Sequence, residues 1–225
     1  MSNLFDCAVD TDLLTGMRLA KIAIAREQLV VIPTDTVYGV AADAFSPAAV
    51  QVLLAAKGRT AQSPPPVLIG DQAGLAALAT DLHPVATDLA ETFWPGALTM
   101  IFKAQPSLAW NLGETRGTVA LRMPDHKIAL ALLAETGPLA VSSANLTGQP
   151  AATTAGAARE YLGKSVEVYL DAGPSPKGEA STILDLSGLS DSSESKIRVV
   201  RLGALSLDKI RRVAGDLLEP EVGSS

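Results

Sequence analysis

Short, apolar, β-branched segments alternate along this chain with segments in which apolar residues recur at helical spacing. The alternation follows no strict strand–helix–strand rhythm, which predicts an α/β fold with a twisted sheet of mixed parallel and antiparallel strands, flanked by helices. The expected strands cover residues 29–32, 66–69, 98–103, 118–123, 139–142, 166–170, 182–186 and 197–202. The expected helices cover residues 11–28, 46–58, 75–79, 84–93, 128–135, 153–162 and 206–218.

The composition restricts the class of protein. The 225 residues are 48% apolar but only 4% aromatic, which suits small-residue helices packed closely on a sheet. The net charge of -6 disfavours a nucleic-acid-binding surface, because such a surface needs an excess of Lys and Arg on one face. The single cysteine, Cys7, excludes an internal disulfide and a cysteine-rich zinc site, and no apolar run is long enough to span a membrane. We therefore expect a soluble, cytoplasmic protein.

A dense polar cluster follows the first expected strand, in the segment 33–39 (PTDTVYG). Pro33 ends strand pairing, and residues 34–36 then offer two hydroxyls and a carboxylate. Taken alone, the segment is most simply explained as a turn, in which Asp and Thr bond their own backbone. Polar groups at the end of a buried strand are also typical of ligand sites in α/β proteins. The recurrence of this pattern downstream favours a shared pocket.

Three cations are candidates for binding an anion. Lys57 falls on the apolar stripe of its helix, so its ammonium must either reach solvent or meet an anion. Arg201 shares its strand face with apolar residues, whereas Arg122 lies on the strand face opposite the apolar one, together with Thr118. The structural explanation is that a cation complements a helix C-terminus and that a strand arginine faces solvent. The functional explanation is that the guanidinium fork grips a carboxylate or a phosphate.

Hydroxyl and amide side chains flank three further strands. Ser143 and Asn145 follow a strand in the segment 140–148 (AVSSANLTG), whereas Thr118 and Thr182 begin strands, Thr182 on the core-facing side. Capped turns explain one or two of these groups, but less easily all of them. Together with the cations they predict a pocket for a polyanion. The scarcity of carboxylates in these segments and the absence of a histidine cluster argue against a protease, a glycosidase or a metal-dependent hydrolase.

In order and spacing, these segments resemble the threonylcarbamoyl-AMP synthase family, also called YrdC-like. The matching motifs are PTDTVYG at 33–39, KGR at 57–59, Arg122 within 118–124, SAN at 143–145 followed by Thr147 and Gly148, Ser181 with Thr182, and VRLG at 200–203. The resemblance implies a single YrdC-like domain of the short form, built around a concave basic cavity. This domain would cover residues 10–213, after an N-terminal extension (1–9) and before a partly disordered C-terminal tail (214–225).

The resemblance implies a nucleotidyltransferase that condenses L-threonine, bicarbonate and ATP to threonylcarbamoyl-AMP and diphosphate. The product would serve N6-threonylcarbamoyladenosine formation at position 37 of tRNA, with a tRNA-modifying threonylcarbamoyl transferase complex as the acceptor. Mg²⁺ would arrive with ATP and be held mainly by its phosphates, so no protein metal site is expected. Neither a membrane nor stable direct binding of nucleic acid is expected.

By position, the resemblance also implies roles for individual residues. The catalytic residues would be Lys57 and Arg59. The residues that bind threonine would be Thr36, Arg122, Val141 and Thr182. The residues that bind ATP would be Arg59, Ser63, Thr118, Ser143, Asn145 and Arg201. Four positions depart from the usual family pattern: Thr60 replaces a proline, Leu68 a histidine that contacts threonine, and Ser63 and Ala151 replace an asparagine and a serine near the nucleotide.

Two other functions fit the same fold. A related carbamoyl-adenylate-forming enzyme occurs within hydrogenase-maturation carbamoyltransferases, but those chains are far longer and carry zinc fingers, which one cysteine cannot build. An RNA-binding module would use a concave basic surface, and the acidic charge balance and low aromatic content count against it.

Overall fold

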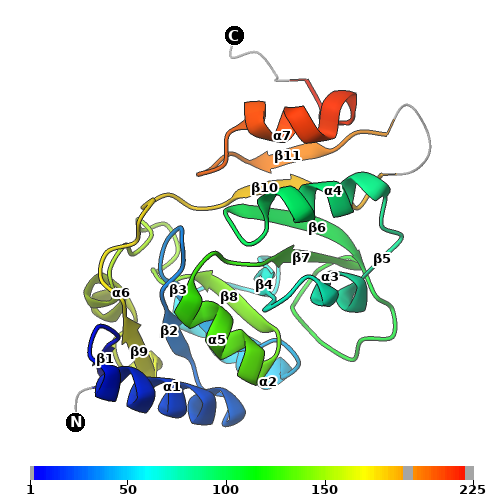
Figure 1. The fold of residues 1–225 in the computed structure, drawn as a ribbon. Helices are drawn as coiled ribbons and strands as arrows, with labels where there is room; N and C mark the ends of the chain where they lie inside the picture. The colour runs from blue at the N-terminus through cyan, green and yellow to red at the C-terminus, as the bar shows by residue number, and fades with distance from the viewer. Residues whose placement is uncertain (1–2, 190–194, 221–225) are drawn as a thin grey trace.

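The computed structural model describes residues 3–189 and 195–220, and within them one sheet of eleven strands runs through the whole molecule (Figure 1). The strands are β1 (Leu4–Asp6), β2 (Val30–Ile32), β3 (Gly39–Asp43), β4 (Val67–Leu68), β5 (Ala79–Thr80), β6 (Leu98–Ala104), β7 (Thr118–Arg122), β8 (Leu139–Ser143), β9 (Val168–Asp171), β10 (Thr182–Asp185) and β11 (Arg198–Arg201). The helices are α1 (Asp10–Ala25), α2 (Pro47–Lys57), α3 (Ala73–Leu78), α4 (Pro84–Phe93), α5 (Lys127–Thr136), α6 (Ala155–Leu162) and α7 (Leu207–Ala214).

The sheet is mixed, as predicted. Its order is β1-β9-β2-β3-β8-β4-β7-β6-β10-β11, and β5 pairs with β6 outside this path. The pairs β1/β9, β9/β2, β4/β7 and β6/β10 are parallel, and the other pairs are antiparallel. Short connections join the antiparallel β2 and β3, whereas each parallel pair is separated by a long crossover, so both kinds of pairing occur in one sheet.

Helices cover both faces of the sheet (Figure 1). α1 and α5 share one apolar core with β2, β8 and β9. α2 and α6 pack on the opposite face, around β3 and the other side of β2. α4 and α7 cover β6, β7 and β10 in a third core at the far end of the sheet.

Burial of both faces explains the continuous apolar run of β2. Val30 and Ile32 pack toward α1 and α5, whereas Leu29 and Val31 pack toward α2 and α6. All four side chains are at most 1% exposed. An interior strand of this kind needs no alternation of polar and apolar residues. The polar segment 33–39 begins directly where this strand ends.

The residues at the two ends of the expected helix 46–58 cap α2. The Ser46 side chain accepts a hydrogen bond from Ala49 N (3.1 Å), and Pro47 occupies the first turn. Gly58 ends the helix with φ 65°, a left-handed conformation that favours glycine. Helix α2 therefore has a fixed end, and the residues that follow it leave in a defined direction.

Strands β1, β3 and β5 were not predicted. β3 (GVAAD) is rich in small residues and begins at Gly39, the last residue of the segment 33–39 that was explained as a turn. β1 lies in the predicted N-terminal extension, yet it pairs in parallel with β9. In the predicted tail, Leu218 is buried and bridges to Ile197, while residues 221–225 lie outside the described residues. No helix in the described ranges is long and apolar enough to cross a membrane.

Candidate active site

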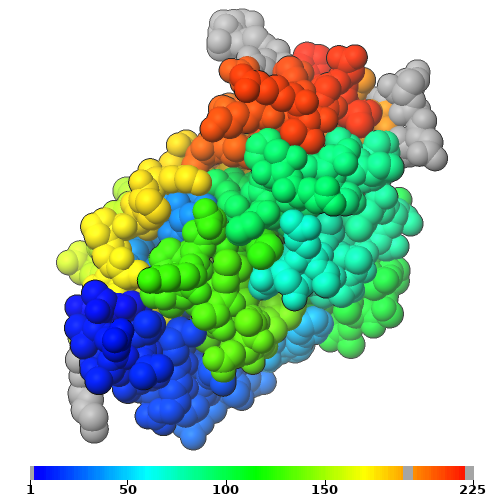
Figure 2. All heavy atoms as spheres, viewed as in Figure 1, coloured from blue at the N-terminus to red at the C-terminus, as the bar shows by residue number. Residues whose placement is uncertain are grey.

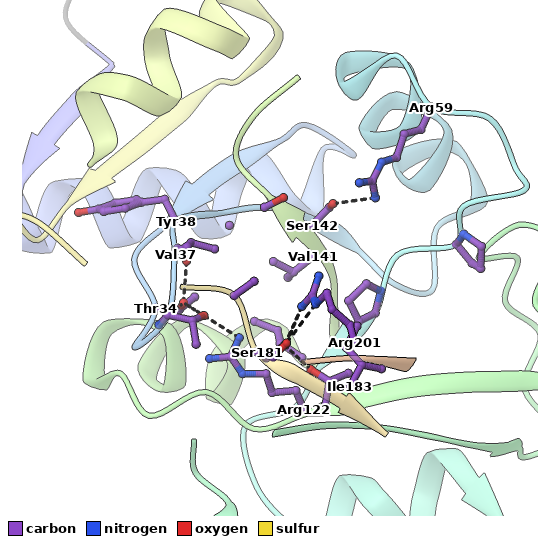
Figure 3. Close-up of a pocket in the computed structure, with 18 residues that line it drawn as sticks. Thr34, Val37, Tyr38, Arg59, Arg122, Val141, Ser142, Ser181, Ile183 and Arg201 are labelled. Carbon is purple, nitrogen blue, oxygen red and sulfur yellow. Dashed lines mark hydrogen bonds between the residues drawn. The ribbon is translucent and has the colours of Figure 1, made fainter. Parts of the chain in front are cut away.

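A cavity of about 220 Å³, partly open to solvent, lies where the central strands end (Figure 3). Its lining comes from the β2–β3 connection, β8, the loop after α2, and the ends of β7, β10 and β11. The lining residues are Thr34, Thr36, Val37, Tyr38, Gly39, Arg59, Pro64, Pro66, Leu68, Thr99, Arg122, Val141, Ser142, Ser143, Ala180, Ser181, Ile183 and Arg201. This lining contains three guanidinium groups and no carboxylate. Its composition favours the basic cavity predicted from the sequence.

The β2–β3 connection forms one wall and is both a turn and part of the cavity. The Thr34 hydroxyl donates to Val37 O (2.7 Å) and accepts from Thr36 N (3.1 Å). These bonds are those expected of a simple turn. Thr36 is only 1% exposed, yet it lines the cavity. The turn bonds therefore hold a hydroxyl of Thr36 in place at the wall.

The segment that precedes β10 lies against this wall. In the space-filling view, this yellow segment runs beside blue atoms of the β2–β3 connection (Figure 2). Gly178 N donates to Thr36 O (3.1 Å), and the Tyr38 hydroxyl donates to Gly173 O (2.6 Å). The two loops are thereby joined by one main-chain and one side-chain hydrogen bond at one side of the cavity.

Arg122 is buried at the end of β7, and each of its three nitrogens has a partner in the protein. Its Nε donates to Gly96 O (2.9 Å) and its Nη1 to Thr36 Oγ1 (2.9 Å), while Nη2 pairs with the Asp35 carboxylate. Burial lowers the pKa of Arg122, and the charge of Asp35 opposes this shift. The other oxygen of Asp35 lies 3.4 Å from the half-exposed Lys177 Nζ. Asp35 supplies the carboxylate noted in the segment 33–39, and the structure makes it the charge partner of Arg122.

Arg59 and Arg201 lie across the cavity from Thr34, Val37 and Tyr38 (Figure 3). Arg201 also lies close enough to Arg122 for its charge to lower the pKa of Arg122. Arg59 Nη1 donates to Ser142 Oγ (3.2 Å), and Arg201 donates to Ser181 O from Nη2 (2.7 Å) and Nε (3.2 Å). Burial, together with the charge of Arg59, lowers the pKa of Arg201. Two guanidinium groups close enough for their charges to repel each other favour an anion beside them.

Lys57 and Asn145 were predicted at the site but do not line the cavity. Lys57 does not reach solvent, so the first of its two expected outcomes is wrong. Its side chain is 1% exposed, and its Nζ donates to the main-chain oxygens of Ser143 and Asn145 (2.7 Å for Asn145). Burial, and to a smaller extent the charge of Arg59, lowers the pKa of Lys57 to about 7. Asn145 donates to Leu146 O (2.9 Å) and braces the turn that follows β8.

The structure also keeps Thr182, Thr118 and Ser63 out of the lining. Thr182 is fully buried, and its hydroxyl donates to Leu205 O (2.6 Å). Thr118 donates to Thr115 O (2.8 Å), and Ser63 is exposed. The core-facing direction expected for Thr182 is the reason, since alternate side chains of a strand point to opposite faces. Its neighbours on either side in the sequence line the cavity instead, namely Ser181 and Ile183.

Four polar lining residues escaped sequence reasoning. Thr34 and Ser142 lie in the predicted site segments 33–39 and 140–148, but neither was named as a site residue. Thr99 and Ser181 share a buried hydrogen bond (2.8 Å) between β6 and the start of β10. The sequence signal for Ser181 was the period-two pattern of its strand, which places it opposite Thr182. No comparable signal marks Thr99, which interrupts the apolar strand β6.

The predicted site residues that the structure brings together are Thr36, Arg59, Arg122, Val141, Ser143 and Arg201. Within residues 3–189 and 195–220, no group of three or more His, Cys, Asp or Glu side chains could hold a metal ion. The three guanidinium groups of the lining suit an anionic ligand.

Comparisons with known proteins agree with this fold. A family model that covers Sua5, YciO and YrdC proteins, with the description "Telomere recombination", matches residues 22–203. A putative threonylcarbamoyl-AMP synthase of Mycobacterium leprae is 47% identical over 215 residues, which are 96% of this chain and 95% of the relative. The threonylcarbamoyl-AMP synthase of Bacillus subtilis is 38% identical over 198 residues, which are 87% of this chain and 56% of the relative.

Solved structures give the same result. Sua5 of Pyrococcus abyssi, in a crystal structure complexed with L-threonine, has a TM-score of 0.86 and 32% identity over 96% of this chain and 62% of that one. YciO of Escherichia coli has a TM-score of 0.78 and 22% identity over 93% of this chain and all of that one, which supports the fold alone. The chain belongs to the Sua5/YciO/YrdC family.

Proposed function

We propose that this chain is a threonylcarbamoyl-AMP synthase, a nucleotidyltransferase that uses L-threonine, bicarbonate and ATP. The observation that carries the proposal is the cavity of a Sua5/YciO/YrdC chain, lined by three guanidinium groups and several hydroxyls without a carboxylate. Relatives that carry this name align over nearly the whole chain. The product would pass to a tRNA-modifying threonylcarbamoyl transferase complex in the cytoplasm.

The reaction needs positioning and charge stabilisation rather than a protein nucleophile. The amine of threonine attacks the carbon of bicarbonate, and loss of water gives a carbamate. A carbamate oxygen then attacks the α-phosphorus of ATP, and the bond to the β-phosphate oxygen breaks to release diphosphate. Guanidinium groups stabilise the charge that spreads over the phosphate oxygens, and the cavity aligns the carbamate with the α-phosphorus.

The two sides of the cavity suit the two substrates. Arg122 and Thr36 lie together on one side, with the apolar side chain of Val141 in the same lining. This side offers a guanidinium and a hydroxyl to the carboxylate and hydroxyl of threonine. Arg59 and Arg201, on the other side, offer two cations to the phosphates of ATP. Magnesium belongs in this scheme to the substrate, held by phosphate oxygens and water.

The first test is the release of diphosphate from ATP. We expect release only when threonine, bicarbonate and Mg²⁺ are all present, because the carbamate is the attacking group and the metal accompanies the phosphates. Omission of each component and chelation by EDTA are the controls. Diphosphate release that does not depend on threonine and bicarbonate would contradict the proposal. No diphosphate release, together with salt-sensitive RNA binding, would favour an RNA-binding module.

Gly39 provides a second prediction, on the shape of the threonine side. A Cβ atom at this position would lie 2.6 Å from Val141 Cγ1, so only glycine leaves Val141 in its place. We expect Gly39→Ala to raise the KM for threonine by about tenfold, the effect of roughly 1.4 kcal/mol of lost binding. Val141→Ala in the same chain should restore part of the loss, because it removes the clashing methyl. A Gly39→Ala variant with unchanged KM would contradict this role of the contact.

A further inference from the structure

The ammonium of Lys57 is fully engaged by the turn that follows β8. It donates to the main-chain oxygens of Ser143 and Asn145 (2.7 Å for Asn145), and to Asn145 Oδ1 at 3.4 Å. An ammonium has three N–H donors, and three acceptors surround this one. Lys57 is also 1% exposed and absent from the cavity lining. Its donors point into the turn and not toward a ligand.

The main-chain oxygen of Lys57 accepts hydrogen bonds from the same turn. Thr147 donates to Lys57 O from its amide (3.1 Å) and from its hydroxyl (2.8 Å). Asn145 Nδ2 closes the turn from within by donating to Gln149 O (2.7 Å). The C-terminal end of α2 and the turn 143–149 are thus joined both by the side chain and by the main chain of one residue.

Two cavity groups depend on this joint. Ser143, which accepts from Lys57, lines the cavity as the last residue of β8. Arg59 lines it two residues beyond Lys57, and its Nη1 lies 3.2 Å from Ser142 Oγ. Without the ammonium, the main-chain oxygens of Ser143 and Asn145 would lose this donor, and the turn would have to rearrange to bring them to water.

We propose that Lys57 is a positioning residue, which fixes the turn 143–149 against α2 and so holds Ser143 and Arg59 on the same side of the cavity. It acts through these residues and does not itself touch the phosphates. The expected effect on ATP binding rests on the proposed function, because the inference assigns Lys57 to the ATP side of that reaction. The joint itself is a structural property that can be measured without catalysis.

Amide hydrogen exchange of the unliganded protein tests the joint. We expect Lys57→Met to speed exchange in the segment 143–149 by at least tenfold, because the amides of Thr147 and Gln149 lose the fixed turn that protects them. Lys164→Met is the matched control, since Lys164 is exposed in the short helix Gly163–Ser165, outside the cavity lining. Unchanged exchange in Lys57→Met would overturn the proposal.

Calorimetric binding separates positioning from direct contact and from general unfolding. We expect Lys57→Met to weaken binding of an ATP analogue with a methylene bridge between its α- and β-phosphates by tenfold or more, and to change threonine binding less than twofold. Equal loss of both ligands would indicate a merely structural role and would overturn the proposal. Weaker analogue binding with unchanged exchange would indicate direct phosphate contact, which also overturns it.

Thr147→Val covers the case in which Lys57→Met does not fold. Thr147 is exposed, and the substitution removes only the hydroxyl that donates to Lys57 O. We expect faster exchange in the segment 143–149 and weaker binding of the same analogue, both smaller in size than for Lys57→Met. No change in either measurement would overturn the proposal. If the wild-type chain makes no threonylcarbamoyl-AMP, the proposed function fails, while the exchange rates still decide the role of Lys57.

Discussion

Replacing Asp35 by Ala is expected to lower the free energy of unfolding by about 3–5 kcal/mol, the usual cost of removing one partner of a buried ion pair. Asp35 and Arg122 form such a pair, with side chains 5% and 8% exposed. The Asp35 carboxylate also accepts from Asp125 N (3.0 Å). Removal of Asp35 leaves the guanidinium of Arg122 without its counter-charge in a buried position.

Chemical denaturation followed by circular dichroism measures this loss. Asp81→Ala is the matched control, because Asp81 pairs with Lys103 at 3.0 Å on the surface, with side chains 62% and 50% exposed. Exposed pairs of this kind contribute about 1 kcal/mol or less. If Asp35→Ala cost no more than Asp81→Ala, the buried pair would not organise this wall of the cavity.

The second large effect is expected on catalysis. Arg59→Ala should reduce kcat/KM for ATP by about 10²- to 10³-fold, as found when one preorganised charge-stabilising donor is removed. The thermal midpoint should change little, because Arg59 is only half-buried and its side chain makes a single hydrogen bond, to Ser142. Steady-state kinetics and a thermal scan of the same preparation measure both quantities.

Arg212→Ala is the matched control for this variant. Arg212 is exposed in α7 and does not line the cavity, so its removal should leave kcat/KM unchanged. A fully active Arg59→Ala variant would mean that the ATP side of the cavity has been assigned wrongly. Loss of activity together with a large fall in the thermal midpoint would instead indicate that Arg59 stabilises the fold.

The elements with strong local signals were predictable from the sequence. Helix α2 has a serine cap, a first-turn proline and a glycine stop, and all three act in the structure as expected. β3 was missed because its small residues carry no strand signal, and its position is set by pairing with β2 and β8. β1 is three residues long and is held by the distant β9, which no local pattern can indicate.

The site was predictable as a set of segments and less so as individual side chains. Thr36, Arg122 and Ser143 lie at the cavity because their strands end there. Thr182 was placed correctly on the core side, which is why it misses the cavity and Ser181 faces it. The partners of Lys57 are main-chain carbonyls of a turn some 86 residues away in sequence, and such contacts depend on tertiary structure alone.

The most direct test of the central claim is the fate of labelled bicarbonate. The chain is incubated with ATP, Mg²⁺, L-threonine and carbon-13 bicarbonate. The products are then separated, and their masses are measured by mass spectrometry. We predict a threonine–AMP adduct that carries the label in its carbamoyl group, formed together with diphosphate. An adduct without the label, or AMP and diphosphate with no adduct at all, would contradict the assignment of this cavity to threonylcarbamoyl-AMP synthesis.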